Sequence, residues 1–360
     1  MRVLIINPGS TSTKIAVFCS DGLLTANTIQ HPFDEISAFK KIADQFDYRM
    51  NAIEKELENN CGDVRELRAV VGRGGLLRPV PSGTYRINNS MLCDLSNANL
   101  WGREHASNLG AFIAKHIGDR LGIPSFITDP ITVDEMTDCA RISGVPDIRR
   151  KSVFHALNVR ACARRASYEL GKDMDTCSFV IIHIGGGISI VAFKQGKCID
   201  VNNALLGMGP FSVNRVGALP TGDLIELAYS GKYTKIELLS LLSKKSGVAA
   251  YTGSDNGLEL SEMIKNGNEK VKLIIEAMAY QIVKEAGGMA AVLEGNLDAV
   301  IISGGLARME ECLMPFIRNH LAYLGKCIVY PGEEEMRAMG EAGMRVLRGE
   351  EEAKEYGRYV

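Results

Sequence analysis

The sequence predicts an α/β fold of two related halves, because one pattern of strand, glycine turn and strand occurs twice. The first copy has apolar runs at residues 3 to 6 and 15 to 18, joined by a turn of Pro, Gly and hydroxyl residues. The second copy has apolar runs at 179 to 184 and 188 to 193, joined by three glycines. A repeat at this spacing indicates a duplicated fold. We expect its two glycine turns to face each other across a cleft.

The first turn is rich in hydrogen-bond donors, which is typical of an anion-binding loop. Gly9 lets backbone amides approach a ligand, and Asn7 offers an oxygen to a metal-bound water. The side-chain donors of the turn come from Ser10, Thr11, Ser12, Thr13 and Lys14. The segment alone fits an ordinary hairpin with a polar turn equally well. The later glycine turns favour a nucleotide phosphate as its ligand.

Two further glycine turns follow apolar strands in the second half of the chain. They contain Gly185, Gly186 and Gly187, and then Gly304 and Gly305. The later pair follows a predicted strand at 298 to 302 and precedes a predicted helix, an arrangement that suits a nucleotide. One glycine turn is weak evidence, whereas three in this order are strong. His183, on an apolar strand, fits a buried structural histidine better than a ligand on spacing alone.

The composition is that of a globular α/β enzyme with a small partner. Its 360 residues suffice for two domains, and 46% of them are hydrophobic and 23% charged. With 41 Lys and Arg against 43 Asp and Glu, no basic excess predicts nucleic acid or an anionic membrane as partner. No stretch approaches the ~20 apolar residues of a membrane span. Nine scattered cysteines without metal-ligand spacing indicate reduced thiols, so we expect a cytoplasmic protein.

In the first half, apolar spacing predicts a meander that continues into helices and short buried strands. The expected elements after the first hairpin are strands at 23 to 30, 67 to 71 and 125 to 128, and helices at 35 to 57 and 105 to 121. The strand at 67 to 71 leads to Arg73, which lies between glycines. Asp129 precedes Pro130, so we expect it at a fixed strand end rather than in a helix.

The second half is expected to be mostly helical. The predicted helices are 153 to 170, 221 to 230, 234 to 243, 257 to 266, 268 to 294, 307 to 319 and 334 to 348, with strands at 298 to 302 and 326 to 330. Arg215 falls in an irregular glycine-containing loop. Residues 141 to 152 are the expected boundary between a domain at 1–150 and a nucleotide-binding domain at 151–330. The segment 331–360 is expected to pack back on the first domain.

Taken together, the motifs resemble those of the acetate and butyrate kinase family, one of the actin and sugar-kinase-like ATPases. The matching segments are Asn7 to Lys14, Phe154 with His155, His183 to Gly187, Asn214 to Gly217, and Pro331 to Glu335. The resemblance runs from end to end and implies duplicated ribonuclease H-like domains with a nucleotide cleft between them. Acetate kinases have asparagine where Gly186 stands and a longer signature around His155. Both differences favour the butyrate branch.

The resemblance also implies a role for each site residue. Arg73 and Arg215 would bind the acyl carboxylate and the transferring phosphoryl group, and His155 would contact the transition state. Asp129 would orient this cluster, while Asn7 and Glu334 would organise Mg²⁺ through waters. The nucleotide would be held by Ser10, Thr11, Ser12, Lys14, His183, Gly185, Gly186, Gly187, Gly304 and Gly305. A homodimer or higher homo-oligomer is implied too.

Elementary chemistry also permits an acid kinase. Phosphoryl transfer needs positioning and charge neutralisation, which two arginines and Mg²⁺ supply. A carboxylate acceptor is already ionised at neutral pH and needs no general base. A sugar hydroxyl needs one, and Asp129 can serve, so the residues alone leave a sugar kinase open. A nucleotide-switched ATPase of another class is a third hypothesis.

The resemblance selects among these hypotheses. It favours reversible, ATP-dependent phosphorylation of butyrate or another short-chain or branched fatty acid, with acetate, propionate or a sugar as alternative acceptors. Each site residue also has a structural interpretation. Arg73 can cap a strand end, Arg215 can pair with Asp223 on the surface, and the acidic residues 333 to 335 can favour the start of a helix.

Overall fold

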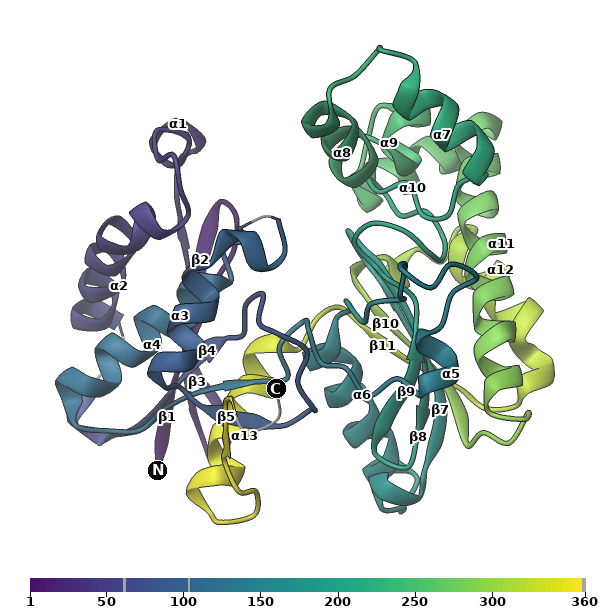
Figure 1. The fold of residues 1–360 in the computed structure, drawn as a ribbon. Helices are drawn as coiled ribbons and strands as arrows, with labels where there is room; N and C mark the ends of the chain where they lie inside the picture. The colour runs from purple at the N-terminus through teal and green to yellow at the C-terminus, as the bar shows by residue number, and fades with distance from the viewer. Residues whose placement is uncertain (61–62, 103, 358–360) are drawn as a thin grey trace. The chain divides into compact units, whose positions relative to one another are not determined.

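The computed structural model describes residues 1–60, 63–102 and 104–357, and the chain forms two compact units. Unit 1 comprises Met1–Val133 together with Glu334–Val360, and unit 2 comprises Asp134–Glu333. Each unit holds one β-sheet with helices packed against it (Figure 1). The end of the chain thus belongs to the same unit as its beginning.

Unit 1 contains a seven-stranded sheet in the order β12-β5-β6-β4-β1-β2-β3. Its strands are β1 Arg2–Pro8, β2 Ser12–Cys19, β3 Gly22–Gln30, β4 Leu67–Arg73, β5 Thr84–Arg86, β6 Ser125–Thr128 and β12 Lys354–Glu355. Its helices are α1 Phe33–Ser37, α2 Phe46–Asn60, α3 Asn89–Ser96, α4 Asn108–Leu121 and α13 Glu335–Leu347. Strand β1 pairs antiparallel with β2 and parallel with β4, and β4 pairs parallel with β6.

Unit 2 contains a five-stranded sheet in the order β11-β10-β7-β8-β9. Its strands are β7 Ser178–Ile184, β8 Ile188–Lys194, β9 Lys197–Val201, β10 Ala299–Gly304 and β11 Cys327–Pro331. Its helices are α5 Asp138–Arg141, α6 Ala156–Glu169, α7 Thr221–Tyr229, α8 Lys235–Lys244, α9 Gly247–Thr252, α10 Gly257–Lys265, α11 Glu269–Val292 and α12 Leu313–Leu321. Strand β7 pairs antiparallel with β8 and parallel with β10, and β10 pairs parallel with β11.

The two sheets share one topology, which confirms the predicted duplication. In each unit an antiparallel meander of three strands is extended by parallel strands on the side of its first strand. The strand order β6-β4-β1-β2-β3 in unit 1 corresponds to β11-β10-β7-β8-β9 in unit 2. Parallel pairs require crossover connections, and helices make these connections in both units.

Helices cover both faces of the unit 1 sheet, because its central strand is apolar on both sides. Successive side chains of a strand point to opposite faces. Leu4 and Ile6 of β1 belong to a core cluster that includes residues of α2 and α4, whereas Val3 lies against Gly343 of α13. The C-terminal helix therefore packs on the first strands of the chain (Figure 1).

The core of unit 2 forms between its sheet and the long helix α11. Asn268 caps this helix, since its side chain accepts a hydrogen bond from the Val271 amide at 3.1 Å. The cluster joins apolar residues of β7 and α11, among them Val180, Ile182, Ile184, Ile275, Met278 and Ile282. Helix α6 packs on β7 and β10.

The prediction of a single helix at residues 35 to 57 is wrong. The structure has α1 at Phe33–Ser37, a 3-10 turn at Ala43–Gln45 and then α2 at Phe46–Asn60. Between these helices, two backbone amides donate to side-chain carboxylates. Lys41 N donates to Asp44 at 3.2 Å, and Ile42 N donates to Glu104 at 2.8 Å. Such side-chain contacts compete with helical hydrogen bonds.

The glycine pair at 304 and 305 is followed by a 3-10 turn, Gly305–Arg308, rather than directly by the helix expected from residue 307. Helix α12 begins only at Leu313. The short elements α3, α5, α9, β5, β9 and β12 were not predicted from the sequence.

Two further observations concern the chain as a whole. Within the described ranges, no helix combines the length and the hydropathy needed to cross a membrane. The eight cysteines that the structure describes are all free thiols, and Cys61 lies outside the described residues.

The packing of α13 on β2 predicts that Gly340→Ala destabilises unit 1. A Cβ at Gly340 would lie 2.4 Å from Cγ of Phe18, so the buried ring must move. Overpacking of this kind costs about 1–3 kcal/mol. Urea unfolding should therefore show a lower free energy of unfolding for this variant. Gly288→Ala in α11 is the control, because a Cβ there meets no atom within 4 Å. Equal stability of both variants would contradict this packing.

Candidate active site

The first glycine turn presents its polar side chains outward at the end of β1. Gly9 N donates to Ser12 O at 2.7 Å, which closes the turn. Ser10, Thr11 and Lys14 are exposed and Ser12 is half-buried, whereas Thr13 is fully buried. The hydroxyls and the ammonium predicted to bind phosphate are thus accessible, while Thr13 faces the interior.

Asn7, Arg73 and Glu335 form a polar cluster at the ends of three elements of unit 1. Arg73 ends β4 and pairs with Glu335 of α13, with 2.7 Å between Nη1 and Oε1. Asn7, near the end of β1, donates from Nδ2 to Oε2 of Glu335 at 2.9 Å. The side chains of Arg73 and Glu335 are only 10% and 16% exposed. One carboxylate therefore holds both predicted site residues in place.

Sequence reasoning missed Glu335 and treated the acidic run as helix capping or as the source of Glu334 alone. Glu334 is the N-cap residue of α13, and its carbonyl accepts from Ala338 N at 2.8 Å. Glu335 lies in the first turn of the helix, where a carboxylate is favoured. The position of α13 beside β1 and β4 brings its carboxylate to Arg73 and Asn7. The only signal in the sequence was the acidic run itself.

Asp129 lies directly after β6 and is 6% exposed. Its backbone has φ of +38°, a strained conformation for a residue other than glycine. Its Oδ1 accepts from Gly83 N at 2.8 Å, and its own amide donates to Gly83 O at 3.0 Å. These two bonds fix the carboxylate in one orientation. Asp129 stands at a strand end, as the sequence predicted.

In unit 2, the second glycine turn is supported from behind by His183. Gly185 N donates to Gly187 O at 3.1 Å within the turn. The ring of His183 is fully buried, and its Nδ1 donates to Oδ1 of Asn158 at 3.0 Å. Its Nε2 lies 3.6 Å from Oε1 of Glu333. The burial agrees with a supporting residue, and nucleotide binding by His183 stays a prediction.

His155 lies at the start of α6 and stacks on His183. The ring centroids are 4.2 Å apart with an interplanar angle of 31°. Ser189 of β8 contacts His155 twice, because its Oγ lies 2.8 Å from Nδ1 and accepts from the backbone amide at 3.2 Å. The two contacts fix the position and the orientation of this half-buried imidazole.

Arg215 and the second glycine turn are packed against each other. Arg215 donates from Nη1 to Ala204 O at 2.6 Å, and a Cβ at Gly187 would lie 2.4 Å from the same Nη1. Ser212 joins the two segments from the other side, since its Oγ donates to Gly186 O at 2.7 Å and accepts from Arg215 N at 3.2 Å. Only glycine at 187 leaves room for the guanidinium.

The third glycine turn meets the end of β7. Gly304 has φ of +98°, and a Cβ there would lie 2.3 Å from Ile184 O. Gly304 and Gly332 exchange two backbone hydrogen bonds, at 3.0 and 2.9 Å. Gly305 is exposed, and a Cβ there would meet nothing within 4 Å.

Each unit thus gathers part of the predicted site at the ends of its strands. Unit 1 contains Asn7, Ser10, Thr11, Ser12, Lys14, Arg73, Asp129 and Glu334. Unit 2 contains His155, His183, Gly185, Gly186, Gly187, Arg215, Gly304 and Gly305. The roles assigned to these residues remain predictions, which the geometry makes specific.

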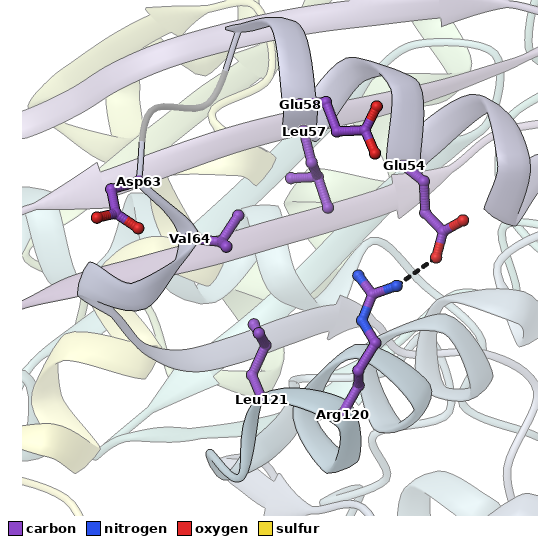
Figure 2. Close-up of a pocket in the computed structure, with 7 residues that line it drawn as sticks. All are labelled: Glu54, Leu57, Glu58, Asp63, Val64, Arg120 and Leu121. Atoms are coloured by element: carbon purple, nitrogen blue, oxygen red, sulfur yellow. Dashed lines mark hydrogen bonds and ion pairs between the residues drawn. The ribbon is translucent and has the colours of Figure 1, made fainter.

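A pocket of about 520 Å³ lies elsewhere in unit 1 (Figure 2). It is lined by Glu54, Leu57, Glu58, Asp63, Val64, Arg120 and Leu121. Arg120 and Glu54 form an ion pair across it. None of the predicted site residues lines this pocket, whose lining comes from α2, from the end of α4 and from residues 63 and 64. We assign it no part in the chemistry.

Comparison with known proteins identifies the family. The model of the Acetokinase family matches residues 145–350. The chain belongs to this family. A probable butyrate kinase of Listeria monocytogenes is 48% identical over 98% of this chain and 99% of its own length. Butyrate kinase 2 of Clostridium acetobutylicum is 46% identical over 99% of both chains.

Solved structures of family members have the same fold. The acetate kinase of Porphyromonas gingivalis superposes with a TM-score of 0.79 at 21% identity, covering 96% of this chain and 99% of that one. A propionate kinase of Francisella tularensis gives a TM-score of 0.76 at 17% identity, covering 95% of this chain and 98% of that one. The predicted actin-like ATPase fold is confirmed.

The contact between Gly187 and Arg215 predicts that Gly187→Ala impairs this acetokinase-family enzyme without unfolding it. The added Cβ pushes away the end of a flexible side chain, so stability should change little. Misplacing a catalytic group by about 1 Å can cost ~10²-fold in rate. We expect a loss of this order in turnover with ATP and a short-chain acid, and an unchanged thermal midpoint. Gly144→Ala, where a Cβ meets no atom within 4 Å, is the control. Full activity of Gly187→Ala would show that Arg215 needs no fixed position.

Proposed function

We propose that the protein transfers the γ-phosphoryl group of ATP to butyrate, giving butyryl phosphate and ADP, in a reversible reaction. The observation that carries this proposal is the identity of 46–48% over nearly the full chain to relatives named as butyrate kinases. A carboxylate oxygen forms the new bond to the γ-phosphorus as the bond to the β,γ-bridging oxygen breaks. ADP leaves with that oxygen.

Arg73 is proposed to neutralise the acyl carboxylate and the phosphoryl group passing to it. A guanidinium that is almost fully desolvated interacts strongly with an anion, and its fork matches two oxygens. Glu335 holds one side of this fork at 2.7 Å. Two anions then share one arginine, so Glu335 sets the orientation of Arg73 and moderates its affinity for the acid. No proton has to be removed from the acceptor.

His155 and Arg215 are proposed to act on the transferring group from unit 2. Ser189 Oγ accepts from the His155 amide at 3.2 Å and lies 2.8 Å from Nδ1. If the Ser189 hydroxyl proton points to Nδ1, the neutral ring carries its proton on Nε2. That proton is then available to an equatorial phosphoryl oxygen. Arg215, fixed against Gly187, supplies a second positive charge.

The residues present fit a magnesium ion that is carried mainly by the nucleotide. Within the described parts of the chain, no group of three His, Cys, Asp or Glu side chains is arranged to hold a metal. Mg²⁺ keeps several waters and binds through substrate phosphates and one or two side chains in such sites. Asn7 gives its amide nitrogen to Glu335, which leaves its oxygen for a metal-bound water. Glu334 is the proposed second group. The bound ion would neutralise the charge of the phosphates.

The nucleotide is proposed to bind at the three glycine turns, with its phosphates at exposed backbone amides. Lys14, Ser10 and Thr11 are accessible at the first turn. Gly186 and Gly305 are exposed and are proposed to offer their backbone amides to the phosphates. The free thiols are in keeping with a cytoplasmic location for the enzyme.

A homodimer through the helices of unit 2 is part of the proposal. Large apolar side chains on α7, α8, α10 and α11 are exposed, among them Ile225, Tyr229, Ile236, Leu258, Leu273 and Tyr280. Apolar side chains that are exposed together on one surface are typical of an interface. Light scattering on the purified protein should give twice the mass of one 39.2 kDa chain, whereas the mass of a single chain would contradict the dimer.

The two arginines give the first test of the mechanism. Arg73→Ala and Arg215→Ala should each reduce kcat by about 10³-fold or more, the scale of catalytic arginines in phosphoryl transfer. Circular dichroism and ATP binding should stay close to wild type. Lysine at either position should restore little, since a point charge does not reproduce the fork. Near-normal turnover in a folded alanine variant would remove that arginine from the mechanism.

Chain-length selectivity tests the substrate. Each methylene that enters an apolar pocket contributes about 0.8 kcal/mol, so two should favour butyrate over acetate by roughly tenfold in kcat/KM. Trapping the acyl phosphate with hydroxylamine should show efficiency rising from acetate through propionate to butyrate. ADP formation with sugars should be small. If acetate is the best acid, butyrate is wrong as the proposed substrate, while the proposed phosphorylation of a carboxylate stands. If a sugar is the best acceptor, the reaction class is wrong.

A further inference from the structure

A fully buried arginine, Arg49 of α2, lies behind the first glycine turn of unit 1. Its relative exposure is 0%. Its Nη2 donates to Ser10 O at 3.1 Å, and its Nη1 donates to Ser12 O at 3.1 Å. The same Nη1 donates to Thr13 Oγ1 at 3.0 Å, and Nε donates to Gln45 Oε1 at 3.0 Å. One guanidinium therefore binds the turn at three points.

The backbone carbonyls of three consecutive residues of the turn accept hydrogen bonds from other residues of unit 1. Arg49 takes those of Ser10 and Ser12, and the His31 amide donates to Thr11 O at 2.8 Å. In a trans peptide the N–H of the next residue points away from the carbonyl. The Thr11 amide is thus directed opposite to Arg49, and the Ser12 amide is directed opposite to the His31 amide. Oriented amides of this kind form anion-binding sites.

The positive charge of Arg49 has only neutral partners among the described residues: two carbonyls, a hydroxyl and a side-chain amide. Burial lowers the pKa of Arg49 from its usual value. The negative charge of Glu35 acts on His31 and raises its pKa, but Glu35 accepts its hydrogen bond from the Tyr48 hydroxyl, at 2.8 Å. A buried charge without a counter-ion is costly unless an anion compensates it.

His31 adds no second charge beside Arg49 at neutral pH. Burial, and then the charge of Arg49, lower the pKa of His31 to about 4. Thr13 Oγ1 lies 2.8 Å from Nε2 of His31 and accepts from Arg49. The neutral imidazole can accept the Thr13 hydroxyl proton, which completes the support of the turn.

We propose that Arg49 is a positioning residue that holds the first turn in an anion-binding conformation and whose buried charge attracts the polyphosphate of the nucleotide. Arg49 does not touch the nucleotide itself. It acts through the amides of the turn and through its field. The inference rests on the proposed function only in that the first turn binds the phosphates of ATP.

The test uses Arg49→Met and Arg49→Lys in the full chain. Calorimetry measures the affinities for Mg-ATP, for inorganic tripolyphosphate and for adenosine. Arg49→Met should weaken binding of Mg-ATP and of tripolyphosphate by about tenfold or more, which corresponds to about 1.4 kcal/mol. Adenosine, which carries no phosphate, should bind as in wild type. Arg49→Lys should recover part of the phosphate affinity, because it keeps the charge but loses the fork.

Arg68→Met is the matched control. Arg68 also donates from Nη1 to two carbonyls, those of Arg65 and Leu67, at the start of β4. Its replacement should leave all three affinities within about twofold of wild type. If Arg49 had a merely structural role, Arg49→Met would have a lower unfolding midpoint, and its affinity for adenosine would fall as much as its affinity for ATP. That result, or unchanged ATP and tripolyphosphate affinity, overturns the proposal.

Arg49→Lys alone carries the test if Arg49→Met does not fold. A fall of about threefold or more in the affinity for tripolyphosphate, with the affinity for adenosine unchanged, supports the inference. Equal losses of affinity for the two ligands, or no loss for either, overturn it. Failure of wild type to bind tripolyphosphate overturns it as well. If wild type binds ATP but forms no acyl phosphate from butyrate, the proposed function fails and the inference on Arg49 stands.

Discussion

Close approach of backbone at the strand ends is the constraint on which both units depend. In unit 1, a Cβ at Gly72 would lie 2.2 Å from Gly110 O, so β4 and α4 touch through their main chains. Arg73 follows directly, and its direction is set by that contact. In unit 2, the guanidinium of Arg215 occupies the space that a side chain at Gly187 would need. A larger residue at either point would displace the neighbouring backbone or guanidinium, and with it the charged groups of the proposed site.

Two arginines of unit 1 are buried for different reasons. Arg73 has a carboxylate partner, Glu335, and removing one member of such a buried pair leaves the other uncompensated. Arg49 has neutral partners, so its charge remains available to a ligand. The first arrangement orients a guanidinium that is proposed to bind the substrate directly. The second is proposed to raise the positive potential of the first glycine turn, while all printed hydrogen bonds of the guanidinium stay within the unit.

The sequence predicted the strands and glycine turns well, because both signals are local. It failed where tertiary contacts decide. Helix breaks before Phe46 depend on Glu104, a residue remote in sequence. Glu335 was hidden in an acidic run that suits any helix start, and only the packing of α13 brings it to Arg73. Arg49, beside apolar neighbours, gave no sign that its side chain is buried rather than solvated.

The environment of Asp129 bears on the choice between an acid and a sugar as acceptor. A general base for a hydroxyl needs a carboxylate oxygen directed at the acceptor. Oδ1 of Asp129 is taken by the Gly83 amide at 2.8 Å, and the reciprocal bond to Gly83 O holds the strained backbone. Asp129 is thus better suited to hold the loop after β6 than to accept a proton, and a carboxylate acceptor requires no proton transfer at all.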